Sequence, residues 1–133
     1  MKLLVDTHIL LWVLSDSPRL SASHKLLLQD TNNEKWVSQC SFMELAIKLK
    51  IGKLPDFVPN LEEVIRHTQA DGFGLLPLRN EHIYAYQKVP LFPDHRDPFD
   101  RFIIATALSE KCTIVTADSK FKLYETLLDV VLV

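Results

Sequence analysis

Short apolar runs separate longer stretches of helical periodicity along this chain. The runs are bounded by polar or charged residues, several are rich in β-branched side chains, and they cover residues 2–6, 35–40, 74–78, 112–118 and 129–133. Runs of this length and composition are typical of buried strands. We therefore expect a strand at each of these positions.

Two of the intervening segments have the spacing of an amphipathic helix. The pattern i, i+3, i+4, i+7 is met by Leu61, Val64, Ile65 and Thr68, and by Phe42, Leu45, Ala46 and Leu49. Asn60 and Glu63 stand where an N-cap and its N3 partner belong, and Gly52 follows the other pattern as a stop. The spacing predicts helices over 60–70 and 41–50.

Strands that alternate with helices predict an α/β protein, here a three-layer α/β/α sandwich around a mainly parallel central sheet. The length of 133 residues suits a single domain over residues 1–133. Ligands of open parallel sheets bind at the carboxyl ends of the strands. Asp6 ends the first expected strand, and Asp118 lies just past the end of the fourth.

Composition indicates the class of protein and its cellular compartment. Hydrophobic residues at 47% and charged residues at 24% are an ordinary globular balance. Asp6 and His8 interrupt the apolar start, no cleavage site follows, and its longest clean run, 9–14, is far short of the roughly 20 residues that span a bilayer. Cys40 and Cys112 lack metal-ligand spacing, and free thiols fit a reducing compartment. A soluble, cytoplasmic protein without a zinc site is expected.

The stretch "HRDPFDRFIIATAL", residues 95–108, places two carboxylates where a further apolar helix begins. Asp97 suits the N-cap and Pro98 suits N1. Asp100 then falls at N3, where the helix dipole favours a negative charge. Helix capping alone is therefore one explanation of both aspartates.

Glu44 and Asp118 also have structural explanations. Glu44 can complete a capping box with Ser41 or pair with Lys48 on a helix surface, and Asp118 suits a turn. Asp6 is harder to explain, because it ends a buried strand and a further apolar run follows it. A buried carboxylate needs a partner or a cation.

Together the four carboxylates predict a cation site. Strand ends and first helical turns would bring them to one edge of the sheet, where like charges repel unless a hard cation neutralises them. Oxygen ligands favour Mg²⁺ or Mn²⁺ over zinc. Neutralising the four also shifts the net charge from −2 by four units to +2, which weakens the objection to a polyanionic partner.

Other α/β functions lack their motifs. With three glycines the chain has no G-x-G-x-x-G and no P-loop, and it has no G-x-S-x-G elbow. A phosphoacceptor receiver domain would usually offer an acidic pair after the first strand, where this chain has Asp6 alone.

The ordered motifs "LLVDTHILLW", "VSQCSFMELAIK…GKL", "HRDPFDRFIIATAL" and "CTIVTADSKF" resemble those of the PIN-domain ribonucleases, most closely the VapC-type toxins of bacterial toxin–antitoxin modules. The resemblance runs over essentially the whole chain. Met43 stands where relatives with the DPFDR signature often have Trp, a difference that concerns local packing because Glu44 is intact.

The resemblance implies a PIN-like fold and a Mg²⁺- or Mn²⁺-dependent endoribonuclease that hydrolyses RNA phosphodiester bonds with a metal-activated water. It implies an RNA substrate, a cognate antitoxin, a homodimer and no membrane. It also implies that Thr116 helps to position the site. Catalysis and metal binding would fall to Asp6, Glu44, Asp100 and Asp118. The alternative is a non-catalytic module of this fold that binds RNA or protein.

Cationic side chains near these motifs are candidates to hold RNA phosphates. They are Lys48, Arg96 and Arg101, with Lys50, Lys53 and His95 nearby. Each of them also fits a solvated helix surface. His8 is a further candidate to face the site, and Phe92 in the loop 89–96 is a candidate to stack on a base.

Overall fold

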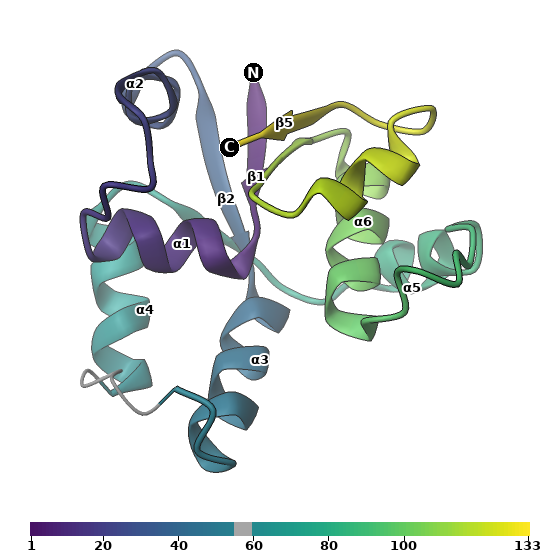
Figure 1. Cartoon of the computed structure of the whole chain (residues 1–133), viewed down its shortest axis with the longest axis horizontal. Helices are drawn as coiled ribbons and strands as arrows, with labels where there is room; N and C mark the ends of the chain where they lie inside the picture. The colour runs from purple at the N-terminus through teal and green to yellow at the C-terminus, as the bar shows by residue number, and fades with distance from the viewer. Residues whose placement is uncertain (55–59) are drawn as a thin grey trace.

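The computed structural model describes residues 1–54 and 60–133. In these residues, five strands form one sheet (Figure 1). The strands are β1 (Lys2–Val5), β2 (Glu34–Ser38), β3 (Gly74–Leu76), β4 (Thr113–Thr116) and β5 (Val130–Leu132). Their order is β3-β2-β1-β4-β5, and each neighbouring pair is parallel. The prediction of a mainly parallel sheet is confirmed.

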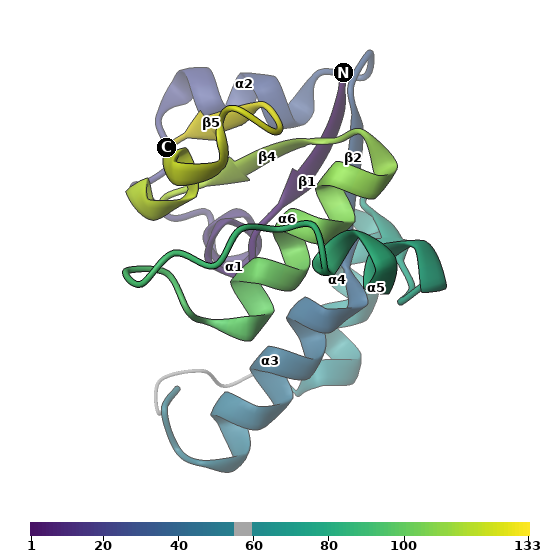
Figure 2. The same ribbon diagram turned by 90° about the vertical axis from the view of Figure 1, so that its right-hand side faces the viewer.

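Helices cover both faces of the sheet (Figure 2). They are α1 (Thr7–Leu14), α2 (Ala22–Gln29), α3 (Gln39–Lys50), α4 (Leu61–Ala70), α5 (Asn80–Tyr86), α6 (Pro98–Glu110) and the 3-10 helix η1 (Ser119–Tyr124). Leu3, Val5 and Val37 pack with α1 to α4 on one face. Leu4 and Ile114 pack with α5, α6 and η1 on the other, so the three-layer α/β/α architecture is confirmed.

The helix expected over 41–50 begins two residues earlier, and the expected Ser41 capping box is wrong. Ser38 is the N-cap, because its hydroxyl accepts from the Cys40 backbone N–H at 3.1 Å. The strand expected over 35–40 therefore ends at Ser38. At the other end of α3, Gly52 has a φ of 73°, as expected of a helix stop.

Helix α4 begins as expected, since Asn60 accepts from the Glu63 N–H at 2.9 Å. Helix α1 was not expected, although Asp6 is its N-cap and accepts from the Ile9 N–H at 2.9 Å. Helices α2 and α5 were not expected either. The two cysteines are free thiols, in agreement with the sequence.

The strand order places a topological switch point between β1 and β4, since β2 and β3 lie on one side of β1 and β4 and β5 on the other. Ligands of open α/β sheets bind at such a point. Val5 is paired with Val115, so Asp6 and Thr116 are the next residues at the carboxyl ends of these strands. Within residues 1–54 and 60–133, no helix combines the length and apolar character needed to cross a bilayer.

Candidate functional site

A pocket of about 380 Å³ lies at the carboxyl ends of β1 and β4. Its lining comes from the two strand ends and from α1, α3, α6 and η1: Asp6, His8, Trp12, Glu44, Lys48, Asp97, Asp100, Ala117, Asp118 and Phe121. The four carboxylates singled out in the sequence thus line one pocket.

Asp6 is held by hydrogen bonds on both carboxylate oxygens. Oδ1 accepts from the Ile9 N–H, and Oδ2 accepts from the Thr116 hydroxyl. Asp6 is only 4% exposed, and this burial raises its pKa. The Thr116 hydroxyl oxygen accepts in turn from the Asp118 N–H at 3.1 Å. Thr116 therefore ties the end of β1 to the turn that carries Asp118.

Glu44 enters the pocket from α3, which contacts both α1 and α6. Its Oε1 accepts from the Thr7 hydroxyl at 2.7 Å, and its Oε2 lies 2.8 Å from Nζ of Lys48. The expected pairing with Lys48 forms, yet Glu44 is buried at 5% exposure rather than on a helix surface. A surface ion pair is therefore an incomplete account of Glu44.

Asp100 shows the electrostatic character of the pocket most clearly. It lies half-buried in the first turn of α6. Its pKa is raised to about 7, first by burial and then by the negative charges of Asp97, Glu44, Asp6 and Asp118. A carboxyl with that pKa is in an environment where negative charge is not compensated.

Asp97 and Asp118 cap helices at the edge of the pocket. Asp97 Oδ1 accepts from the N–H groups of Phe99 and Asp100 at 2.8 and 3.3 Å, so its predicted N-cap role is confirmed. Asp118 Oδ1 accepts from the Lys120 N–H at 2.9 Å and begins η1. One ligand atom from each of His95, Asp100 and Asp118 lies within 4.8 Å of the other two.

The cationic candidates have different surroundings. Lys48 lines the pocket, and Arg96 is exposed in the loop before α6. Arg101 is 5% exposed, and its guanidinium donates to the carbonyls of Val89 and Pro90 at 3.1 and 2.6 Å. Because these contacts hold its charged group inside the protein, we leave Arg101 out of the proposed substrate-binding residues.

Three other cationic candidates lie outside the lining of the pocket, and only His95 departs from the expectation of a surface position. Lys50 and Lys53 are exposed and are not among the residues that line the pocket. His95 is 3% exposed, and burial lowers its pKa, so it is not a surface cation.

Phe92 is half-buried, with its ring centroid 5.1 Å from that of Tyr124 in an edge-to-face arrangement, so the expectation of an exposed side chain is wrong. Stacking of this ring on a base stays a prediction. His8 does line the pocket, as expected.

Two side chains that hold residues of the site by hydrogen bonds were not anticipated from the sequence. Thr7 donates to Glu44, and the hydroxyl of Tyr124 lies 2.7 Å from Nδ1 of His95. A hydroxyl residue directly after a strand-end aspartate was an available signal for Thr7. No local pattern marks Tyr124, which follows His95 by 29 positions.

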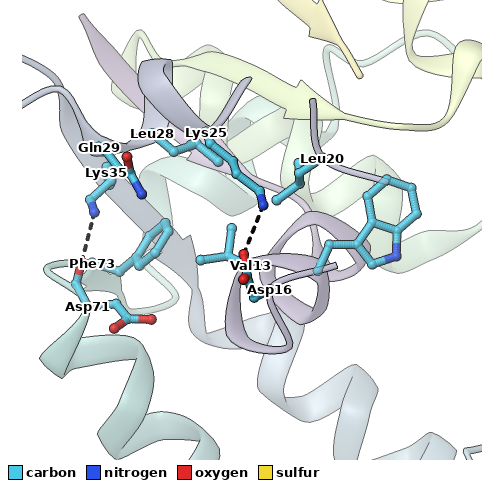
Figure 3. Close-up of a pocket in the computed structure, with 10 residues that line it drawn as sticks. Val13, Asp16, Leu20, Lys25, Leu28, Gln29, Lys35, Asp71 and Phe73 are labelled. Atoms are coloured by element: carbon cyan, nitrogen blue, oxygen red, sulfur yellow. Dashed lines mark hydrogen bonds and ion pairs between the residues drawn. The ribbon is translucent and has the colours of Figure 1, made fainter. Parts of the chain in front are cut away.

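A second pocket, of about 230 Å³, lies beside α1 and α2 and is lined in part by Phe73 and Leu28 (Figure 3). Its charged groups are compensated by nearby groups of the chain. Lys25 pairs with Asp16 at 2.9 Å, and Lys35 donates to the Asp71 carbonyl at 2.7 Å. This pocket therefore lacks the excess of negative charge that distinguishes the first.

Comparisons with known proteins agree with this architecture. The model of the PIN domain family matches residues 3–127. Similar solved structures include VapBC2 from Rickettsia felis bound to a DNA fragment from their promoter, at a TM-score of 0.70 and 18% identity, covering 98% of each chain.

Two further structures are similar over almost their whole length. VapBC-1 from nontypeable Haemophilus influenzae has a TM-score of 0.68 and 20% identity, covering 99% of this chain and 98% of that one. A toxin–antitoxin complex from Klebsiella pneumoniae has a TM-score of 0.58 and 21% identity, covering 96% and 94%. No curated protein matches the chain. The family match spans most of the sequence, and the chain therefore belongs to the PIN domain family.

Proposed function

We propose that this protein is a Mg²⁺- or Mn²⁺-dependent endoribonuclease that acts as the toxin of a toxin–antitoxin module. The observation that carries the proposal is the crowding of carboxylates in one pocket. The charges of four neighbouring carboxylates contribute to raising the pKa of Asp100 to about 7. Lys48 offsets only part of this charge, through its pair with Glu44.

The donor set fits a hard divalent cation. Asp6 and Asp100 would hold the ion, with Glu44 and Asp118 completing its oxygen ligands or orienting a water. When bound, such an ion lowers the pKa of a coordinated water and offsets negative charge on the phosphoryl oxygens of the substrate. The ion also favours the ionised form of Asp100, which burial and its neighbours disfavour.

The chain fixes the carboxylates before substrate arrives. Thr116 holds Asp6 and the Asp118 backbone, and Thr7 holds Glu44. Such preorganisation keeps the directions of the oxygens constant during the reaction. Lys48 in the pocket and the exposed Arg96 are the proposed contacts for RNA phosphates.

The match to the family and the similar structures, which include a toxin–antitoxin complex, support the proposal of a protein partner. We propose a cognate antitoxin that binds this chain, a homodimer, and a cytoplasmic location. The competing function is a PIN-like module that binds RNA or protein without cleaving.

Cleavage of a structured RNA separates the two functions. Wild-type protein with Mg²⁺ should cut the RNA, whereas EDTA should stop cleavage. Asp6→Asn should be inactive while folded, because asparagine caps a helix about as well as aspartate but is a poor ligand for a hard cation. Asp129→Asn, an exposed aspartate just before β5, is the matched control and should cut normally. RNA binding without cleavage by the wild type would favour the competing function.

The toxin role has its own test in cells. Expression of the wild-type chain alone should arrest bacterial growth, and Asp6→Asn at equal abundance should relieve the arrest. If Asp6→Asn arrests growth equally well, catalysis at this pocket is not the cause.

A further inference from the structure

His95 is a buried side chain that contacts Asp100 of the candidate site and two aromatic residues of the core. It is 3% exposed, and both ring nitrogens have a partner. Nε2 is 3.1 Å from Oδ2 of Asp100, and Nδ1 is 2.7 Å from the Tyr124 hydroxyl. The rings of Phe121 and Tyr124 pack against the imidazole, with their centroids 5.2 and 5.4 Å from its centroid. These contacts fix both the position and the rotation of the ring.

The partners also indicate which nitrogen carries the hydrogen. With a cation bound, Asp100 would be ionised and could only accept, so Nε2 would donate to it. Nδ1 then accepts from the Tyr124 hydroxyl, which keeps its proton because burial raises the pKa of Tyr124. Tyr124 is fully buried, so no solvent competes for this contact. The hydrogen bonds run in one direction, from Tyr124 through His95 to Asp100.

We propose that His95 is a positioning residue for the cation site: it holds Oδ2 of Asp100 and leaves Oδ1 to the cation, while Tyr124 fixes its tautomer. This role rests on the proposed function, since it requires that Asp100 binds a cation. Hydrogen-bond partners that orient the ligands of a metal typically change metal affinity or activity by about 10- to 100-fold when they are removed.

Direct ligation of the cation by His95 is the competing arrangement, because its ligand atoms lie near those of Asp100 and Asp118. Two observations favour positioning. Nε2 lies within hydrogen-bond distance of Asp100, so it is directed at that carboxylate. Hard divalent cations also prefer the oxygens that the pocket supplies in excess.

Two amide substitutions test the role of the Nε2 donor separately from that of the rest of the imidazole ring. In His95→Gln the side-chain nitrogen can take the place of Nε2 and donate to Asp100. In His95→Asn the shorter amide lies near the place of Nδ1, keeps a polar partner for Tyr124 and loses the bond to Asp100. Tyr124→Phe keeps the aromatic packing and removes only the hydroxyl that fixes the tautomer.

Manganese binding to the full chain measures the effect without relying on cleavage, with the EPR signal of free Mn²⁺ as readout. His95→Asn should bind Mn²⁺ about 10- to 100-fold more weakly than wild type. His95→Gln should stay close to wild type, and Tyr124→Phe should fall between them. A folded His95→Asn variant with wild-type affinity overturns the positioning role. Pulsed EPR that detects a His95 nitrogen bound to Mn²⁺ overturns it as well, in favour of direct ligation.

The wild-type protein offers a measurement that does not depend on a variant that folds. In the Mg²⁺-loaded protein, imidazole NMR signals should place the hydrogen on Nε2 of His95. A hydrogen on Nδ1 leaves Nε2 nothing to donate and overturns the proposal. If the wild type binds no Mn²⁺ at millimolar concentration, both this role and the proposed function fail. His95-dependent Mn²⁺ binding without RNA cleavage supports the positioning role and overturns only the ribonuclease function.

Discussion

The two ends of β1 and α6 carry ionisable groups in opposite electrostatic surroundings. At one end lie Asp6 and Asp100, whose pKa values are raised, chiefly by burial. At the other end Lys2 pairs with Glu110 at 3.3 Å, and His82 lies 2.8 Å from the same carboxylate. The pKa of Glu110 is lowered, first by the hydrogen bond from His82 and then by Lys2.

The difference distinguishes an ionic cluster that compensates its own charge from the pocket that we propose binds a cation. At the Lys2 end the chain supplies cationic and donor groups for its own carboxylate, which needs nothing from solution. At the Asp6 end it gathers carboxylates and offers Lys48 as an ion-pair partner to Glu44. A carboxylate cluster that the protein does not neutralise itself is expected to bind a cation, because association with the ion offsets the repulsion.

The largest effect is expected from Asp100→Asn, which disrupts the proposed cation site at the Asp6 end. In the wild type, Mn²⁺ at 100 times its dissociation constant should stabilise the fold by about 2.7 kcal/mol relative to EDTA. Asp100→Asn should lose most of this stabilisation and the RNA cleavage, while its stability in EDTA holds or rises because one of the crowded negative charges is gone. Melting curves with EDTA and with Mn²⁺ measure both effects. Equal wild-type curves under the two conditions would count against a cation site.

The second prediction concerns a substitution that disrupts the ionic cluster at the Lys2 end. Glu110→Ala removes the acceptor of the buried His82 and should lower the free energy of unfolding by about 1–3 kcal/mol, the usual cost of an unsatisfied buried donor. Glu110→Gln keeps an acceptor and should lose less. Urea unfolding gives both values. Both variants should retain the Mn²⁺ response and cleavage, and a lost Mn²⁺ response in Glu110→Ala would show that the two ends are coupled.

The third prediction uses pH to distinguish the two ends. The pKa of Asp100 is about 7 in the folded protein and 3.8 for the ordinary carboxyl, so the folded state binds more protons between these values. Its contribution to the stability of the metal-free protein is therefore complete below the ordinary value and is lost as pH rises through about 7. Solvent reaches this half-buried group, so the effect should be smaller than a fully buried carboxyl would give.

Urea unfolding in EDTA, at pH values from 4 to 8, measures this decline. Asp100→Asn should decline less steeply than wild type, and saturating Mn²⁺ should also flatten the wild-type curve. Parallel curves for the two proteins would contradict the prediction.

The sequence predicted the sheet and the position of the carboxylates because both depend on local pattern. A strand run ends at Asp6, another ends just before Asp118, and each carboxyl end lies at the same edge of a parallel sheet. Helix α1 escaped prediction since its residues from Ile9 to Leu14 are apolar on every side and show no helical periodicity. Ser38 rather than Ser41 caps α3, a choice between two serines that only the path of the chain decides.

Features that depend on distant contacts could not be predicted in this way. Arg101 belongs to an apolar helix next to Asp100, and its sequence context alone suits an RNA contact. Its role is set by the carbonyls of Val89 and Pro90, which the loop before α6 brings against it. His95 likewise takes its surroundings from Tyr124, in an element that local periodicity did not mark.

The smallest expected effect concerns Asp97, which precedes Asp100 by three residues but should behave like a structural residue. Asp97→Ala removes the cap of α6 and should cost about 1 kcal/mol of stability, as other cap deletions do. Asp97→Asn should keep the cap, the Mn²⁺ response and most of the cleavage. Because the charge of Asp97 is one cause of the raised pKa of Asp100, Asp97→Asn should also make the stability of the metal-free protein less dependent on pH. Melting curves and cleavage at matched Mg²⁺ compare the two variants with Asp100→Asn. A folded Asp97→Asn protein that is as inactive as Asp100→Asn would place Asp97 among the cation ligands and erase the distinction between a cap and a ligand in this helical turn.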